Sequence, residues 1–163
     1  MKKILIGFCC FSASFAINAE IVKNKAGERI ELKDNGTWIK VPYTKDDYVN
    51  DGEKYLIKID DGNKQPVDVN VYPDVTLMGK ADPILKEVIN FNIKMTSLSA
   101  QYKLKNRFSY KPKNVSVTQK GRDVQIGIEY TGENSYGADV ASSFKNTYYI
   151  EETGKLKQTS PMF

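Results

Sequence analysis

Residues 83–105 read PILKEVINFNIKMTSLSAQYKLK and hold the long helix that this sequence predicts. Apolar side chains recur there at alternating steps of four and three residues, which is the spacing of one face of an α-helix. That face consists of Ile84, Val88, Phe91, Met95, Leu98 and Tyr102. Asp82 suits the N-cap position, and Pro83 suits the first helical position. We therefore predict a helix over 83–105 whose apolar face is buried.

Two other interpretations of this segment remain open. Residues 89–95 alternate between apolar and polar side chains as a strand would, and Asn90 and Asn92 are poor helix formers. The apolar face is also of the kind that packs against a partner helix or forms a dimer seam. The helical spacing extends over more of the segment than the strand-like alternation does, so it favours a helix. The strands that follow this segment favour burial of its apolar face within the same domain.

Strand-like alternation surrounds this helix on both sides. The alternating runs are 55–59, 67–71, 115–117, 124–130 and 140–150. Asp60-Asp61-Gly62-Asn63 separates the first two runs and favours a hairpin turn over a calcium loop, because the closing Glu of a calcium loop is missing. We predict an α+β fold in which an antiparallel sheet packs on one long helix, over residues 54–163.

A small β-hairpin module is predicted over residues 20–42. Gly27 marks a first turn, and Asp34-Asn35-Gly36 marks a second, since Asn-Gly suits the positive φ angles of a tight hairpin. Residues 43–53 are polar, contain Gly52 and read as a linker to the larger domain.

The N-terminus has the three parts of a secretory signal peptide over residues 1–19. Lys2 and Lys3 precede an uncharged apolar run that ends in small residues. We predict cleavage after Ala19, with cleavage after Ala16 as the alternative, and a periplasmic or secreted product. The apolar run is too short to cross a bilayer, which takes about 20 residues. No later segment is long enough either, so we predict no stable membrane span.

Both cysteines of the chain, Cys9 and Cys10, lie inside this signal. Neither follows a small residue, and both come early in the apolar run, so lipid attachment is disfavoured. Their removal leaves the exported chain without cysteine. The removal of Lys2 and Lys3 reduces the 24 basic residues to 22, against 20 acidic ones, for a net charge of +2. This near-neutral balance gives no reason to expect binding to nucleic acid.

The chain contains no histidine. Histidine is the commonest general base and metal ligand, and cysteine is the other usual ligand for zinc. Carboxylates, Ser, Thr, Lys and Tyr remain, but their spacing singles out no catalytic pair. We predict no catalytic residue, no metal site and no cofactor, and therefore a protein that is not an enzyme.

Three residues are predicted as possible contacts for a partner: Trp38, Asn134 and Tyr136. Asn134 and Tyr136 fall in the loop 132–137, whose Tyr, Asn and Ser side chains are good contact residues. The structural alternative for this loop is an ordinary hairpin connection. For Trp38, the alternative is packing of the small module onto its neighbour.

Two stretches resemble parts of known bacterial proteins. Residues 26–38, AGERIELKDNGTW, resemble a short hairpin that follows the signal peptide in many uncharacterised bacterial envelope proteins. Residues 102–137 are similar to a widespread α+β pattern, through Leu104-Lys105-Asn106 and the loop Asn134-Ser135-Tyr136-Gly137. The resemblance implies an N-terminal hairpin and a C-terminal α+β domain, and it implies no activity.

Together these features predict a non-catalytic periplasmic or secreted protein that binds another envelope macromolecule, either an envelope protein or a cell-wall component. One alternative is an inhibitor or immunity-type protein that blocks a lytic enzyme. A less favoured alternative is a hydrolase of cell-wall glycan that works with carboxylates.

Overall fold

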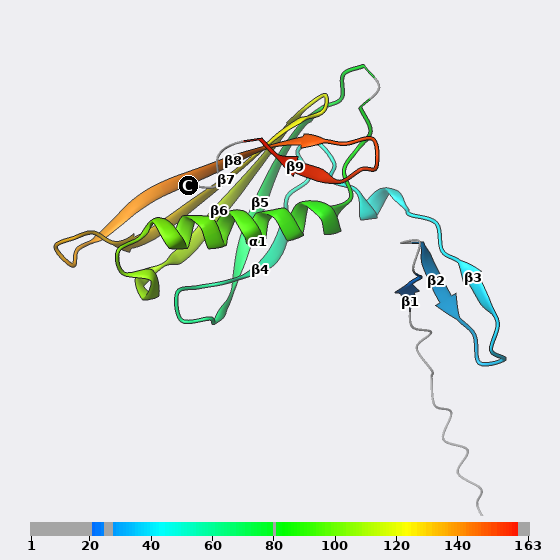
Figure 1. Ribbon diagram of the computed structural model, residues 1–163, viewed down its shortest axis with the longest axis horizontal. Helices are drawn as coiled ribbons and strands as arrows, with labels where there is room; N and C mark the ends of the chain where they lie inside the picture. Colours follow the sequence, from blue (N-terminus) through cyan, green and yellow to red (C-terminus); the bar gives the residue numbers. More distant parts are fainter. Residues whose placement is uncertain (1–20, 25–27, 80, 160–163) are drawn as a thin grey trace, which may run out of the picture. The chain divides into compact units, whose positions relative to one another are not determined.

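A computed structural model describes residues 21–24, 28–79 and 81–159 of the chain (Figure 1). The predicted signal peptide, and Gly27 in the predicted first turn, lie outside these residues. The chain divides into two compact units, Met1–Tyr43 and Thr44–Phe163.

The first unit is a small antiparallel sheet of three strands. Its strands are β1 (Ile21–Lys23), β2 (Arg29–Leu32) and β3 (Trp38–Lys40), in the order β1-β2-β3. The turn predicted from Asp34-Asn35-Gly36 joins β2 to β3. Lys33 N donates to Thr37 O at 2.8 Å, and Gly36 has a φ of 78°. Positive φ is the reason for a glycine at this point.

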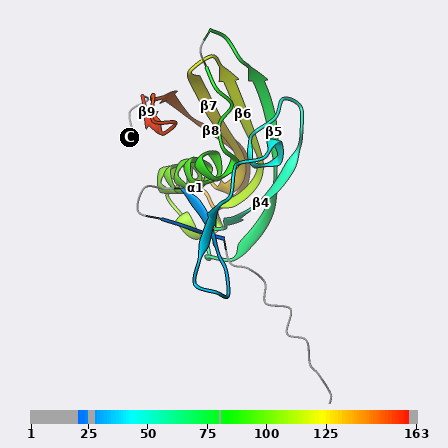
Figure 2. The ribbon, with the colours of Figure 1, turned by 90° about the vertical axis from the view of Figure 1, so that its right-hand side faces the viewer.

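The second unit has the predicted α+β fold. A single sheet has the strand order β4-β5-β6-β7-β8-β9 and packs against α1. The elements are β4 (Tyr55–Asp60), β5 (Pro66–Thr76), α1 (Lys86–Lys103), β6 (Lys111–Lys120), β7 (Asp123–Glu133), β8 (Asp139–Ile150) and β9 (Leu156–Gln158), with short 3-10 turns η1 (Lys45–Asp47) and η2 (Arg107–Ser109). Figure 2 shows the sheet curving around α1.

One pair of strands makes this sheet mixed, where the sequence predicts an antiparallel sheet. β5 and β6 are parallel, with Val71 opposite Val115 and Val75 opposite Gln119. The chain crosses from β5 to β6 through α1. Parallel strands need such a long connection, because the chain must return to the end of the sheet at which β5 begins before β6 can run in the same direction. The other neighbouring strands of this sheet are antiparallel.

The helix begins at Lys86, so the prediction of Asp82 as N-cap and Pro83 as first helical residue is wrong. The residues before Lys86 pair with another part of the backbone. Val49 N donates to Ile84 O at 2.8 Å, and Leu85 forms an isolated β-bridge with Tyr48. This pairing keeps Leu85 extended, with a ψ of 134°, and delays the first helical turn.

The predicted buried face of α1 is wrong over most of its length. Ile84, just before the helix, is buried and Val88 packs at the edge of the core, but the other four members of the face are exposed. The buried residues of α1 are Ile89, Ile93, Thr96, Ser97 and Ala100. Since each helical residue turns by about 100°, these five lie on the side opposite to the predicted face.

Two hydrogen bonds allow the hydroxyls of this buried face to lie in the core. The hydroxyls of Thr96 and Tyr148 are 2.7 Å apart, and those of Ser97 and Tyr110 are 2.6 Å apart. Buried polar groups of this kind are tolerated when they have a partner. The tyrosines therefore let a less apolar face of α1 pack against the sheet.

The concave face of the sheet supplies most of the core. The predicted strand alternation is confirmed here, because the inward-facing members of the runs are buried. They are Ile57, Ile59, Val69, Val71, Val115, Val117, Val124, Ile126, Ile128, Tyr130, Tyr148 and Ile150. The segment 43–53, which the sequence predicts to be a linker, also contributes Val49 to this core.

The ionisation of Tyr110 makes the free energy of unfolding depend on pH above neutrality. Burial raises the pKa of Tyr110 from 10.0 to about 12, and the nearby Tyr130 adds to the rise, while the bond to Ser97 opposes it. The unfolded phenol ionises first, so this contribution to stability is complete below about pH 10 and is lost as the pH rises towards 12. The loss is at most about 1.4 kcal/mol per pH unit within this window.

We therefore expect the urea midpoint of the protein to fall between about pH 9 and about pH 11. Tyr110→Phe should show a smaller fall over the same range. Burial also raises the pKa of Tyr55, but that residue is present in both proteins and contributes equally to each. The same fall in both proteins would contradict the assignment to Tyr110.

Candidate binding surface

Four large apolar side chains are exposed along the outer side of α1. Phe91 is 64% exposed, Met95 41%, Leu98 42% and Tyr102 47%. Their spacing of four, three and four residues places them in one row, which we call the outer stripe. A row of large apolar groups in contact with water is uncommon on a monomer unless it serves as a contact surface.

A groove lies beside the outer stripe, between α1 and β4. It has a volume of about 240 Å³ and is lined by Lys58, Ile59 and Asp60 from β4. The residues from α1 are Lys94, Met95, Ser97, Leu98 and Gln101. Met95 and Leu98 belong to both the outer stripe and the groove, so the apolar surface continues from one to the other. We call this feature the α1–β4 groove.

Contacts of Tyr55 hold β4 along the first half of α1. The Tyr55 hydroxyl donates to Asn90 Oδ1 at 3.1 Å, and Lys86 Nζ lies 5.3 Å from the centre of the Tyr55 ring. Further along both elements, Ile59 and Asp60 line the groove together with Ser97 and Leu98. The strand and the helix therefore run in the same direction along the groove.

β4 is an edge strand of the six-stranded sheet. It pairs with β5 through all six of its residues, and no other strand in the described part of the chain pairs with it. One row of its backbone N–H and C=O groups therefore faces away from the sheet. Leu56 on this strand is exposed, which adds an apolar side chain to the edge.

The charges around the outer stripe are mostly positive. Lys94 and Lys103 are exposed on α1, and Lys105 and Arg107 follow its C-terminus. The Arg107 guanidinium lies 4.1 Å from the centre of the Tyr102 ring. Glu87 is the acidic residue on α1 and is exposed. This side of the domain therefore suits an acidic partner better than a basic one.

Asn134 and Tyr136 lie in the turn between β7 and β8. Asn134 Oδ1 accepts hydrogen bonds from Tyr136 N at 2.9 Å and from Ala138 N at 3.1 Å. The side-chain oxygen of Asn134 thus shapes the turn, whereas Tyr136 is 95% exposed. Of the two, Tyr136 is the side chain that is open to solvent.

Trp38 lies on β3 in the other unit and is 55% exposed. None of the described residues of that unit is buried, so its strands have no apolar core among them. The three predicted contact residues thus belong to two units, Trp38 to the first and Asn134 and Tyr136 to the second.

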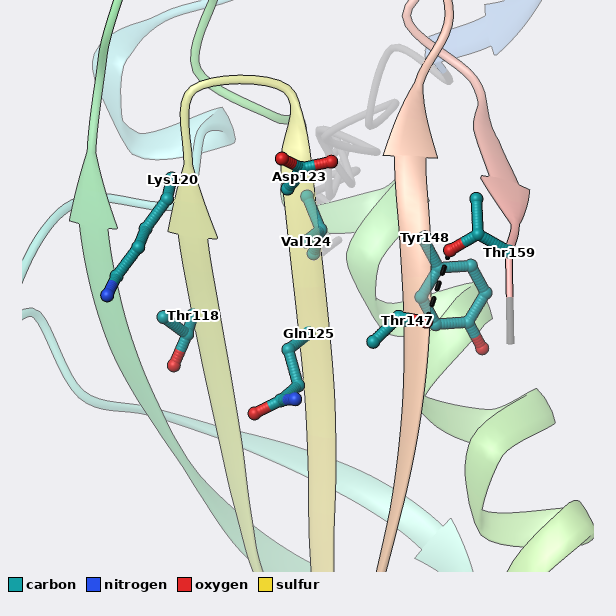
Figure 3. Close-up of a pocket in the computed structure, with 8 residues that line it drawn as sticks. All are labelled: Thr118, Lys120, Asp123, Val124, Gln125, Thr147, Tyr148 and Thr159. Carbon is teal, nitrogen blue, oxygen red and sulfur yellow. Dashed lines mark hydrogen bonds between the residues drawn. The ribbon is translucent and has the colours of Figure 1, made fainter.

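A second depression lies across β6, β7 and β8 and has a volume of about 340 Å³ (Figure 3). Thr118, Gln125 and Thr147 lie opposite one another on the three strands. Thr159 Oγ1 donates to Thr147 Oγ1 at 3.1 Å. The charged residues of its lining are Lys120 and Asp123. Among the described residues, Asp123 is the one carboxylate of this lining.

Within residues 21–24, 28–79 and 81–159, no group of three or more His, Cys, Asp or Glu is arranged to hold a metal ion. No helix in these same ranges is long and apolar enough to cross a membrane. Comparison with known protein families, with curated proteins and with solved structures finds no match to this chain.

The sequence favours burial of the outer stripe and keeps a contact with a partner helix, or a dimer seam, as the alternative for the same residues. A second helical row was present in the sequence, formed by Ile89, Ile93, Ser97 and Ala100 at steps of four and three. The small side chains of Ser97 and Ala100 in this row allow the helix to approach the sheet closely, and they are the signal in the sequence that this row is the inner one.

Proposed function

We propose that this chain is an exported, non-catalytic protein that binds another macromolecule of the cell envelope. The observation that carries the proposal is the outer stripe of α1, with Phe91 and Tyr102 as aromatic groups at its two ends. Aromatic side chains dominate the energetics of protein contacts, because they bury a large area at a small cost in conformational entropy. The predicted signal peptide supports an envelope location for this contact.

The residue inventory supports binding rather than catalysis. The chain has no histidine, and its two cysteines lie in the predicted signal peptide. The groups left for proton transfer are carboxylates, lysine and tyrosine. The partly buried Tyr55 and the buried Tyr110 have raised pKa values, would stay protonated at neutral pH and are poorly suited to act as general bases.

A capture experiment with the exported form, residues 20–163, tests this proposal. The tagged protein is incubated with envelope extract and compared with the double variant Phe91→Ser, Tyr102→Ser. We expect the captured partner to fall at least tenfold with the double variant, which corresponds to about 1.4 kcal/mol of binding free energy. Both side chains are exposed, so the fold should be retained.

Val140→Ser is the matched control, because Val140 is also a partly exposed apolar residue but lies on β8. It should capture the partner as well as the unchanged protein does. Equal capture by the double variant would contradict the proposal, and so would turnover of peptidoglycan fragments by the purified protein.

A second candidate function, inhibition of a lytic enzyme, is favoured by the hairpin of β7 and β8. This hairpin extends past the end of α1 in Figure 1 and presents Tyr136 at its turn. A projecting turn with an exposed aromatic side chain can insert into the active-site cleft of an enzyme. In assays of peptidoglycan-cleaving enzymes, Tyr136→Ala should then lose inhibition at least tenfold, while Phe91→Ser should keep it.

A further inference from the structure

We propose that the free edge of β4 binds an extended peptide segment of the partner, which adds a seventh strand to the sheet and covers the α1–β4 groove. This inference rests on the proposed function and specifies the partner's chemistry. The bound segment would carry apolar side chains at every second position and acidic side chains between them. Three independent features of the domain support this geometry.

The first feature is the backbone of β4. Its residues Tyr55–Asp60 form a regular strand that is paired on one side, by β5. An added strand would lie about 4.8 Å away and would satisfy the outward row of N–H and C=O groups. Natural edge strands are commonly shielded by a bulge or a covering loop. The register between β4 and β5 contains no bulge.

The second feature is the apolar wall beside this edge. Alternate side chains of an added strand point to the two faces of the sheet. One set would point to the α1 side, where Met95 and Leu98 line the groove. The groove volume of about 240 Å³ equals that of roughly eight water molecules, which is room for one or two apolar side chains.

The third feature is the charge on the other face of the edge. Lys54 and Lys58 are exposed there, and Lys58 lies 3.2 Å from Asp68 on β5. The second set of side chains on the added strand would lie directly beside these lysines. Asp60 is the opposing carboxylate at the far end of β4. An acidic residue is therefore favoured most beside Lys54, less beside Lys58, which Asp68 already partly neutralises, and disfavoured beside Asp60.

The area of the outer stripe argues for a peptide segment over a second copy of this chain. A patch of four side chains covers a few hundred Å² at most. A stable interface between two folded proteins buries about 800 Å² on each partner. A single segment that gains backbone hydrogen bonds from β4 needs less apolar area than such an interface does.

A library of displayed random ten-residue peptides tests this inference on residues 20–163. The Leu98→Lys variant serves for counter-selection, because Leu98 lines the groove and is exposed enough to tolerate a lysine. We expect the enriched peptides to alternate apolar and acidic residues. A synthetic copy of one such peptide should shift the backbone amide signals of Tyr55–Asp60 in a saturable NMR titration.

Leu98→Lys should raise the dissociation constant of this peptide at least tenfold. Val140→Ser, which changes an exposed apolar residue on β8 that does not line the groove, should change it less than twofold. Methylation of every second peptide nitrogen should also weaken binding at least tenfold, because it removes the donors that pair with β4. Loss of envelope capture with the Phe91 and Tyr102 double variant is a separate result that concerns the proposed function alone.

Several outcomes would overturn the inference. Enriched peptides with a helical period, or no enrichment over the Leu98→Lys variant, would exclude strand addition. Binding of phosphatidylglycerol vesicles in place of any peptide would make the outer stripe a lipid contact. Concentration-dependent shifts of the β4 amides without peptide, together with dimers in sedimentation, would make a second copy the occupant.

Discussion

Ile93→Ala is expected to cost about 2–5 kcal/mol of the free energy of unfolding. Ile93 is 0% exposed and lies on the inner side of α1, in the core between the helix and the sheet. Truncation would leave a cavity that the surrounding strands cannot fill without moving. Urea unfolding followed by circular dichroism measures the change, provided that the slope of the transition stays constant.

Leu98→Ala is the matched control for this substitution. Leu98 is on the same helix and has the same number of carbon atoms as Ile93, but 42% of its surface is exposed. Its truncation should cost about 1 kcal/mol or less, because less area is removed from contact. The helical period alone, by contrast, predicts Leu98 as the buried residue. A larger loss for Leu98→Ala than for Ile93→Ala would show that the predicted face is the buried one.

Gly62→Ala is expected to cost about 3 kcal/mol. Gly62 lies in the turn between β4 and β5, where Gly62 N donates to Tyr110 O at 2.8 Å. A Cβ atom at this position would overlap the carbonyl oxygens of Arg107 and Phe108. These are backbone atoms, so no side-chain rotation relieves the overlap, and the turn would have to move away from η2.

The loss for Gly62→Ala is measured by thermal and urea unfolding, with Gln65→Ala as the control in the same turn. Gln65 is exposed, and its backbone N–H donates to Asp61 Oδ1 at 2.9 Å, a bond that alanine keeps. The control should stay within about 0.5 kcal/mol of the unchanged protein. A change this small for Gly62→Ala as well would show that the turn does not contact η2 closely.

The same turn shows what local sequence chemistry can predict. The sequence favours a turn at Asp60-Asp61-Gly62-Asn63, and the structure confirms it. Asp61 Oδ1 accepts from Asn63 N at 2.8 Å, in addition to its bond from Gln65 N. Aspartate in turns commonly accepts from the backbone two residues later, so this contact was predictable from neighbouring residues alone.

The candidate site was less accessible to prediction. The sequence predicts Tyr136 as a possible contact because its loop carries Tyr, Asn and Ser side chains, which are good contact residues. The α1–β4 groove was not identified. Its two walls are β4 and α1, and their contact depends on how the sheet curves rather than on any local motif.

The sequence by itself determined most of the strands, the turns between them and the presence of one long helix, because each depends on side chains within a few residues of one another. It did not predict the short strand β9. The tertiary structure decided which face of that helix is buried. Both faces carry apolar residues at helical spacing, so local periodicity does not distinguish them. The choice depends on Thr96 meeting Tyr148 and Ser97 meeting Tyr110. Tyr148 is 52 residues further along the chain than Thr96, and only the folded sheet brings the two hydroxyls together.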